Sequence, residues 1–339
     1  MENMLKVTAS PHVVDRSSTR MLMGNVVIAL LPCVIASALI FGWEALMVVG
    51  VTTAACVGFE WLYCLLMKKP NPVGDLSAVV TGLILGLNMP VFMSQKLWIA
   101  IVGAFIAIVI TKQLFGGLGY NFANPALVGR IVLFTGFASA MTTWMHPDKA
   151  RATMNAMGID SAARATPLQV MNADGSSALG NYPLKDLLLG VHGGVLGETC
   201  AVAIIAGFLW LVVTRTISPA IPLTYVGSYA VFSAIYHLAQ GTAGVPMLVL
   251  HEVLAGGLLF GAVFMATDYV TSPFTLKGKL VFGVGLGLIT FAIRAFGTMP
   301  EGVSYAILFM NLMVPYINDL TRQKPLGKKK KSKKEAKAA

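Results

Sequence analysis

Apolar runs long enough to cross a lipid bilayer recur along almost the whole chain. A membrane helix needs about 20 mostly apolar residues, because the hydrocarbon core is about 30 Å thick and an α-helix rises about 1.5 Å per residue. Only 12% of the 339 residues are charged and the mean hydropathy is +0.74, whereas soluble domains carry about 25% charged residues. The sequence therefore predicts an all-α integral membrane protein.

The apolar runs predict about ten transmembrane helices in two groups of five. They cover residues 21–41, 45–66, 76–92, 97–115, 122–141, 198–214, 219–238, 248–267, 280–297 and 303–320. The third is short and contains Gly82, Gly86 and Pro90, which indicates a broken or re-entrant helix. Because five is odd, the second group inserts upside down relative to the first, the arrangement of an inverted repeat.

The predicted organisation has four parts. They are an N-terminal arm with the first five helices (1–141), a long polar loop (142–197), the second five helices (198–321) and a basic tail (322–339).

Basic residues in the short loops set the predicted orientation. Ten spans place both termini on one side, and that side holds Lys68, Lys69, Lys112, Arg215, Lys277 and Lys279. The short loops on the other side hold little more than Lys96. The positive-inside rule therefore places both termini in the cytoplasm and the long loop outside.

The tail carries much of the net charge of +10, with eight lysines from Lys324 to Lys337. No aromatic residue interleaves them, so nucleic-acid binding is not indicated. A solvated end, or contact with anionic lipid headgroups, explains the run.

Three polar positions in or near the apolar segments are of interest. Arg130 lies about nine residues, or roughly 13 Å, into the predicted fifth helix, and an ionisable residue at that depth is a functional candidate. Its partner is either a carboxylate, in a structural ion pair, or an anionic cofactor. Arg294 lies nearer the outer end of its helix, where we expect it to reach the membrane interface. Asp268, followed by Thr271, either binds a cation or caps the next element.

No metal site and no catalytic dyad is predicted. The four cysteines (Cys33, Cys56, Cys64 and Cys200) lie in apolar segments without CxxC spacing, and the histidines are scattered. Cysteines placed in this way are typical of small buried apolar side chains.

Several motifs, in this order over nearly the whole chain, carry a family resemblance. Gly119-Tyr120-Asn121-Phe122-Ala123-Asn124-Pro125-Ala126-Leu127 leads into Arg130, Ala165-Thr166-Pro167-Leu168 lies in the long loop, and Met265-Ala266-Thr267-Asp268 precedes Thr271-Ser272-Pro273. Thr-Pro in a loop is by itself typical of a turn. Taken together, the motifs resemble the family of RnfD (RsxD) and NqrB, membrane subunits of Rnf electron-transport complexes and of the Na⁺-pumping quinone reductase.

The resemblance implies that Thr166 carries FMN through a phosphoester bond made by a dedicated flavin transferase. In the family motif Asp-x-x-Ser-(Gly/Ser/Thr)-Ala-Thr, this chain matches at Asp160, Ala165 and Thr166 and departs at Ala163 and Arg164. Arg164 is an expected counterion of the flavin phosphate. Arg130, Asn121 and Asn124 are further expected cofactor-binding residues. A second, non-covalent flavin such as riboflavin is open by analogy with NqrB, and no motif decides it.

The function that the resemblance implies is electron transfer within a complex that couples ferredoxin/NAD redox chemistry to Na⁺ or H⁺ translocation. The chain is then not catalytic alone, and it lies in the cytoplasmic (inner) membrane of a bacterial cell. Its expected partners are other Rnf membrane subunits, a cytoplasmic iron–sulfur/flavin module and an extracytoplasmic covalent flavoprotein. The competing hypothesis is a secondary transporter or channel with a urea-channel-like inverted-repeat fold and no redox role.

Overall fold

The computed structural model describes residues 18–145, 166, 168, 183–297 and 302–323. Within these residues the secondary structure is helical and contains no strand. Asp160, Ala163, Arg164 and the lysine run of the tail lie outside the described residues, as does most of the long loop.

The first group of helices begins at the amino end of the described chain. It comprises α1 (Thr19–Phe41), α2 (Trp43–Leu66), η1 (Val73–Asp75), α3 (Ser77–Leu87), η2 (Val91–Lys96), α4 (Leu97–Phe105), the π-helix η3 (Ile106–Gln113), α5 (Pro125–Gly136) and α6 (Ala138–Met141). Local sequence explains where α5 starts. The Asn124 side chain accepts from the backbone N–H groups of Ala126 and Leu127, and Pro125 needs no N–H partner at the first position.

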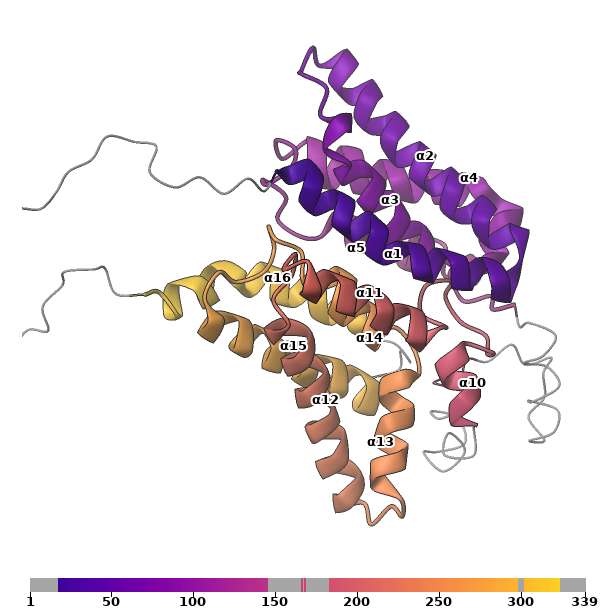
Figure 1. Ribbon diagram of the computed structural model, residues 1–339, viewed down its shortest axis with the longest axis vertical. Helices are drawn as coiled ribbons and strands as arrows, with labels where there is room; N and C mark the ends of the chain where they lie inside the picture. The colour runs from indigo at the N-terminus through magenta and orange to yellow at the C-terminus, as the bar shows by residue number, and fades with distance from the viewer. Residues whose placement is uncertain (1–17, 146–165, 167, 169–182, 298–301, 324–339) are drawn as a thin grey trace, which may run out of the picture.

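The second group follows the long loop. It comprises α10 (Leu184–Leu189), α11 (Ala201–Val213), α12 (Ala220–Ala239), α13 (Val245–Leu254), α14 (Leu258–Phe260), the π-helix η5 (Gly261–Met265), α15 (Leu276–Phe296) and α16 (Val303–Leu320). Figure 1 shows the two groups as two lobes, with α11 and α16 lying along the first lobe. The lobes meet where α1 packs on α11 and α5 packs on α16.

The multi-pass membrane character predicted from the sequence is confirmed. Five helices among the described residues are long and apolar enough to cross a membrane, and a sixth is added if α13 and α14–η5 count as one bent span. Each of the ten predicted segments coincides with helix, but α3, α5 and α11 are shorter than a full crossing. The number of crossings and the inverted repeat stay predictions.

The third segment is short, as the sequence indicated, because α3 has only 11 residues, and its broken or re-entrant character stays a prediction. Its glycines let it approach α2 closely. A Cβ on Gly82 would lie 2.5 Å from Thr53 Cα, and one on Gly86 would lie 2.9 Å from Val49 Cα. The sequence missed a break in the eighth segment, where α13 and α14–η5 are bent by 65°.

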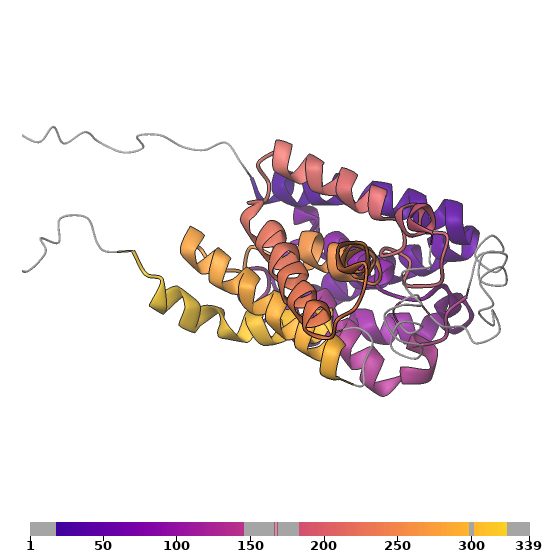
Figure 2. The same ribbon diagram turned by 90° about the horizontal axis from the view of Figure 1, so that it is seen from below.

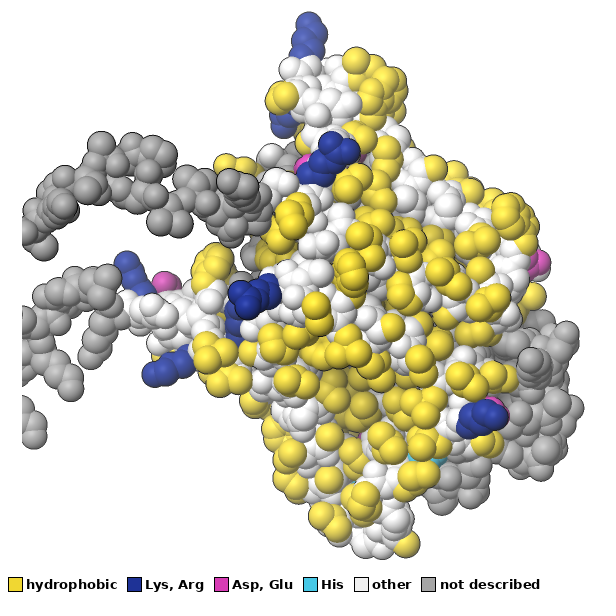
Figure 3. Space-filling view, viewed as in Figure 1, with side chains coloured by type: hydrophobic (Ala, Val, Ile, Leu, Met, Phe, Trp, Pro, Cys, Tyr) yellow, Lys and Arg dark blue, Asp and Glu magenta, His cyan; other side chains and the backbone are white. Residues whose placement is uncertain are grey.

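The surface fits this architecture. In Figures 1 and 2 the start of α1 and the end of α16 lie at the same side of the molecule, and α10 lies toward the opposite side in Figure 1. Apolar side chains cover most of the face seen in Figure 3, and most of the lysine and arginine side chains on it lie toward the side of the two chain ends.

Candidate functional site

The described parts of the long loop dock onto the break in the eighth segment. Leu168 is buried, and its Cδ2 lies 3.4 Å from where a Cβ on Gly256 would stand. Farther along the loop, Leu187 of α10 packs with Leu254 and Ala201 in a small buried cluster. Both pieces of the loop therefore rest on the turn between α13 and α14.

Thr166 lies two residues before Leu168, so their Cα atoms are at most about 7 Å apart. Its side chain is half-buried. The threonine that the sequence singled out is thus held near the turn at Gly256, which adopts a φ of +76°.

Arg294 lies beneath this turn and is 5% exposed. This corrects the expectation that it reaches the membrane interface. Its Nη1 donates to the Glu252 carbonyl oxygen at 2.9 Å and to the Tyr229 hydroxyl at 3.2 Å, and its Nη2 donates to the Ala255 carbonyl oxygen at 3.4 Å. The bend of the eighth segment leaves the carbonyl oxygens at the end of α13 without N–H partners from the helix. The Arg294 guanidinium donates to two of these oxygens.

A buried network fixes Arg294 from the other side. The Glu252 carboxylate accepts from the hydroxyls of Tyr229 and Ser233, both on α12, and His237 Nε2 lies 2.7 Å from Glu252 Oε1. The Arg294 guanidinium also lies over the Tyr229 ring, 5.0 Å from its centroid. Four segments distant in sequence thus converge around the turn: the loop, α12, α13 and α15.

Arg130 is buried, as its predicted depth indicated, and it has protein partners. Its Nη1 lies 3.0 Å from Glu198 Oε1 and donates to Asn88 Oδ1 at 2.6 Å. Backbone bonds from Leu196 N–H to Met89 O and from Gly197 N–H to Leu87 O bring Glu198 to the end of α3. The carboxylate partner that the sequence left open is therefore present, and it ties the two lobes together.

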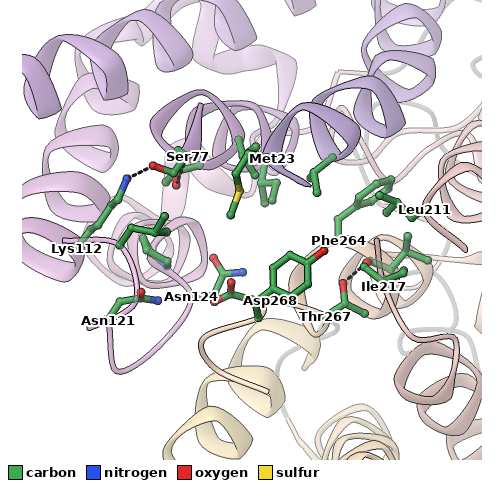
Figure 4. Close-up of a pocket in the computed structure, with 18 residues that line it drawn as sticks. Met23, Ser77, Lys112, Asn121, Asn124, Leu211, Ile217, Phe264, Thr267 and Asp268 are labelled. Carbon is green, nitrogen blue, oxygen red and sulfur yellow. Dashed lines mark hydrogen bonds between the residues drawn. The ribbon is translucent and has the colours of Figure 1, made fainter. Parts of the chain in front are cut away.

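A pocket between the lobes collects another set of the predicted residues (Figure 4). Asn121, Asn124 and Asp268 line it, with Lys112, Thr267 and Tyr269 and otherwise mainly apolar side chains of α1, α3, α11 and η5. Its empty space is about 700 Å³, part of it open to solvent. Asn124 bridges the lobes, because its Nδ2 donates to the Met265 carbonyl oxygen at 3.2 Å.

Asp268 lies beyond the end of η5, and burial raises the pKa of its carboxyl. The hydroxyl of Thr271 donates to Asp268 Oδ2 at 2.9 Å, and this bond and those from the Asn121 side chain and the backbone oppose the shift. Asp268 and Thr271 are thus in contact, and the cation-binding or capping role of Asp268 stays a prediction. Within the described residues, no group of three or more His, Cys, Asp or Glu side chains is placed to hold a metal ion.

The predicted cofactor-binding residues thus do not lie in one place, and Arg130 lies in the contact with Glu198. Asn121 and Asn124 lie in the pocket beside the end of η5, whereas Leu168, two positions after Thr166, lies against Gly256 just before α14. The eight helical residues between these ends span about 12 Å. Arg164 lies outside the described residues.

Sequence reasoning missed one buried ion pair. Lys112, which the sequence placed among the cytoplasmic loop charges, is 2% exposed, and its Nζ lies 2.6 Å from Glu60 Oε1 and donates to Ser77 Oγ at 2.6 Å. Gln113 Nε2 also donates to Glu60 Oε1, at 2.8 Å. A lysine at the end of an apolar run usually signals the interface, and only the packing of η3 against α2 reveals the pairing.

Comparison with known proteins decides the family. The family model described as NQR2, RnfD, RnfE matches residues 6–327. The chain belongs to that family. The match covers both lobes and the loop between them, so it includes Arg130, Thr166 and Arg294.

Curated relatives agree over nearly their full length. The chain is 40% identical to a subunit of the Na(+)-translocating ferredoxin:NAD(+) oxidoreductase complex of Acetobacterium woodii, over 98% of each chain. It is 36% identical to a subunit of the proton-translocating ferredoxin:NAD(+) oxidoreductase complex of Clostridium ljungdahlii, over 96% of this chain and 97% of the relative. A subunit of the ion-translocating oxidoreductase complex of Stutzerimonas stutzeri is also 36% identical, over 94% of this chain and 95% of the relative.

Proposed function

We propose that this chain is a membrane-embedded electron-transfer subunit of an ion-translocating ferredoxin:NAD⁺ oxidoreductase complex. The full-length match to relatives named as the corresponding subunit of such complexes carries the proposal. The chain works with the other subunits of the complex rather than alone. Those partners are other Rnf-type membrane subunits, a cytoplasmic iron–sulfur/flavin module and an extracytoplasmic covalent flavoprotein.

Thr166 is the proposed attachment point of FMN, linked through its phosphate by a flavin transferase. The fit is supported by the docking of Leu168 on Gly256, which holds this part of the loop against protein. The buried Arg294 near the same turn suits an anionic group. When bound, the flavin supplies the ability to accept and release electrons, and the chain supplies position, redox tuning and insulation from water.

The pocket between the lobes is the proposed site of a second, non-covalent flavin such as riboflavin. It lies between the lobes and is partly open to solvent, so a small molecule can reach it. Its mainly apolar lining suits a flat aromatic ring, and the side chains of Asn121 and Asn124 supply polar groups that can orient one.

The proposed topology is ten segments in two inverted halves, with both termini cytoplasmic and the loop 142–197 outside the inner membrane. One further feature supports the repeat. In each half, a basic residue near the end of the fourth segment joins a buried network with the second and third: Lys112 with Glu60 and Ser77, and Arg294 with Tyr229 and Glu252. An inverted repeat places such equivalent positions on opposite sides of the membrane.

Flavin fluorescence on a denaturing gel tests the redox proposal directly. The protein is produced together with a flavin transferase, purified, denatured and viewed under ultraviolet light. We expect a fluorescent band for the wild type and none for Thr166→Ala, with Thr142→Ala, a change at the first residue of the loop, as the matched control that keeps the band. A dark wild-type band, or a fluorescent Thr166→Ala band, contradicts covalent attachment and favours a transporter or channel.

The same denaturation releases any flavin that is not covalently bound. Chromatography of the soluble fraction should detect it, and Val80→Trp, which fills the pocket, should remove it while the fluorescent band remains. Absence of released flavin from the wild type contradicts the second site.

A further inference from the structure

The turn between α13 and α14 brings the loop and a buried cation to the same point. An added Cβ on Gly256 would lie 3.2 Å from Arg294 Nη2 and 3.4 Å from Leu168 Cδ2. These two groups therefore flank the same face of Gly256. Thr166 lies two positions before Leu168 in the sequence.

Arg294 is held in a defined orientation there. Two carbonyl oxygens at the end of α13 and the Tyr229 hydroxyl accept from it, and the Tyr229 ring lies against it. Tyr229 is itself tied to the Glu252 carboxylate at 3.1 Å. A side chain restrained by a ring on one face and by acceptors at its donors loses little further freedom when it meets a ligand, which is the condition for a preorganised site.

The Arg294 guanidinium has negative charge nearby, because the Tyr229 hydroxyl that it bonds donates to the Glu252 carboxylate; the cation is therefore kept in the buried site. A phosphodiester at Thr166 carries one negative charge, and reduction places a further electron on the attached ring. A fixed cation in surroundings of low dielectric constant stabilises both the phosphodiester charge and the added electron.

We propose that Arg294, oriented by Tyr229 and Glu252, is the positioning residue that sets the reduction potential of the flavin nucleotide carried by Thr166. The turn at Ala255–Gly257, here called the seat, is then the surface against which the loop packs at Leu168. This inference rests on the proposed attachment of flavin at Thr166 and assigns to Arg294 a role distinct from that of Arg130, which bonds Glu198 and Asn88 between the lobes.

Redox titration of the covalent flavin in the purified, full-length protein tests the inference. Removing an opposite charge within about 4–6 Å changes a protonation equilibrium by 10-fold or more, and an added electron responds to the same field. We therefore expect Arg294→Gln to lower the midpoint potential, with about a tenfold smaller equilibrium constant for reduction. Arg294→Lys should recover part of the change, because it keeps the charge but not the planar set of donors.

The control variant is Lys277→Gln, which removes an exposed cation from the first turn of α15. Lys277 lies about 25 Å along the helix from Arg294, so its loss should leave the potential of the covalent flavin unchanged. Tyr229→Phe removes one oxygen that holds Arg294 and keeps the ring, so it should lower the potential less and in the same direction. If Arg294→Gln does not fold, Tyr229→Phe provides the test of the inference.

An unchanged potential in both Arg294→Gln and Tyr229→Phe, or an equal shift in Lys277→Gln, overturns the inference. Gel fluorescence of each variant is measured first. A wild type without covalent flavin defeats the proposed function itself, whereas a fluorescent wild type with unshifted variants defeats only the role of Arg294.

Discussion

The contribution of a charged residue to the stability of this protein depends on whether it is buried. Lys112 and Glu60 are 2% and 0% exposed, and each places a charge where water cannot solvate it. The pair therefore persists only because each member compensates the other, together with Ser77 and Gln113.

Removing one member of this pair should cost far more than removing both. Lys112→Met leaves the Glu60 carboxylate buried without its cation, and we expect a loss of about 3–5 kcal/mol in stability. The double variant Glu60→Met/Lys112→Met replaces both charges by apolar groups and should unfold close to the wild-type temperature. Both predictions are measured by heating each variant in detergent and recording the fraction of protein that stays monodisperse. A double variant that is less stable than Lys112→Met contradicts this account.

At the scale of helices, close packing depends on a few glycines. The short α3 lies against α2 where Gly82 and Gly86 leave room, and α11 lies against α1 where a Cβ on Gly207 would collide with the Ala29 carbonyl oxygen. Without a hydrophobic driving force between helices in lipid, such close approach supplies much of the attraction.

A methyl group at one of these contacts should separate the helices. Gly82→Ala places its Cβ 2.5 Å from a backbone atom, Thr53 Cα, and overpacking of this kind costs about 1–3 kcal/mol. Gly58→Ala is the matched control on α2, since nothing lies within 4 Å of its added Cβ, and it should be neutral or slightly stabilising. Equal melting temperatures for the two variants in detergent would show that this contact is not tight.

The whole molecule is organised around the contact between two lobes. Arg130 with Glu198, and Asn124 with the Met265 carbonyl, join them near the middle of the chain. The start of α1 and the end of α16 lie at the same side, whereas α10 lies toward the opposite side in Figure 1. The proposed topology, with both termini on one side of the membrane, requires an even number of crossings between them.

The sidedness can be measured in cells. Green fluorescent protein becomes fluorescent in the bacterial cytoplasm but not after export as an unfolded chain. Its fusion to either terminus should therefore give fluorescence, and its insertion into the long loop should give none. Alkaline phosphatase fusions should give the reverse pattern. Fluorescence from the loop fusion, or from only one terminus, contradicts the proposed topology.

The amino-acid sequence alone determined the membrane character, the helical class and the positions of the apolar segments, because these follow from composition and from the length needed to cross hydrocarbon. It also indicated the short third segment, since Gly82, Gly86 and Pro90 are local signals. The motifs with Asn121, Thr166 and Asp268 pointed to the family for a similar reason, because they are continuous in sequence.

Only the tertiary structure decided which polar residues meet. The partner of Arg130 is Glu198, 68 positions away, and no local pattern could identify it. Arg294 is buried rather than interfacial because its guanidinium bonds carbonyl oxygens that the break at Gly256 leaves without helical partners. Contacts between distant segments depend on how whole helices pack, so the seat beside Thr166 and the pocket at Asn121 appear only in three dimensions.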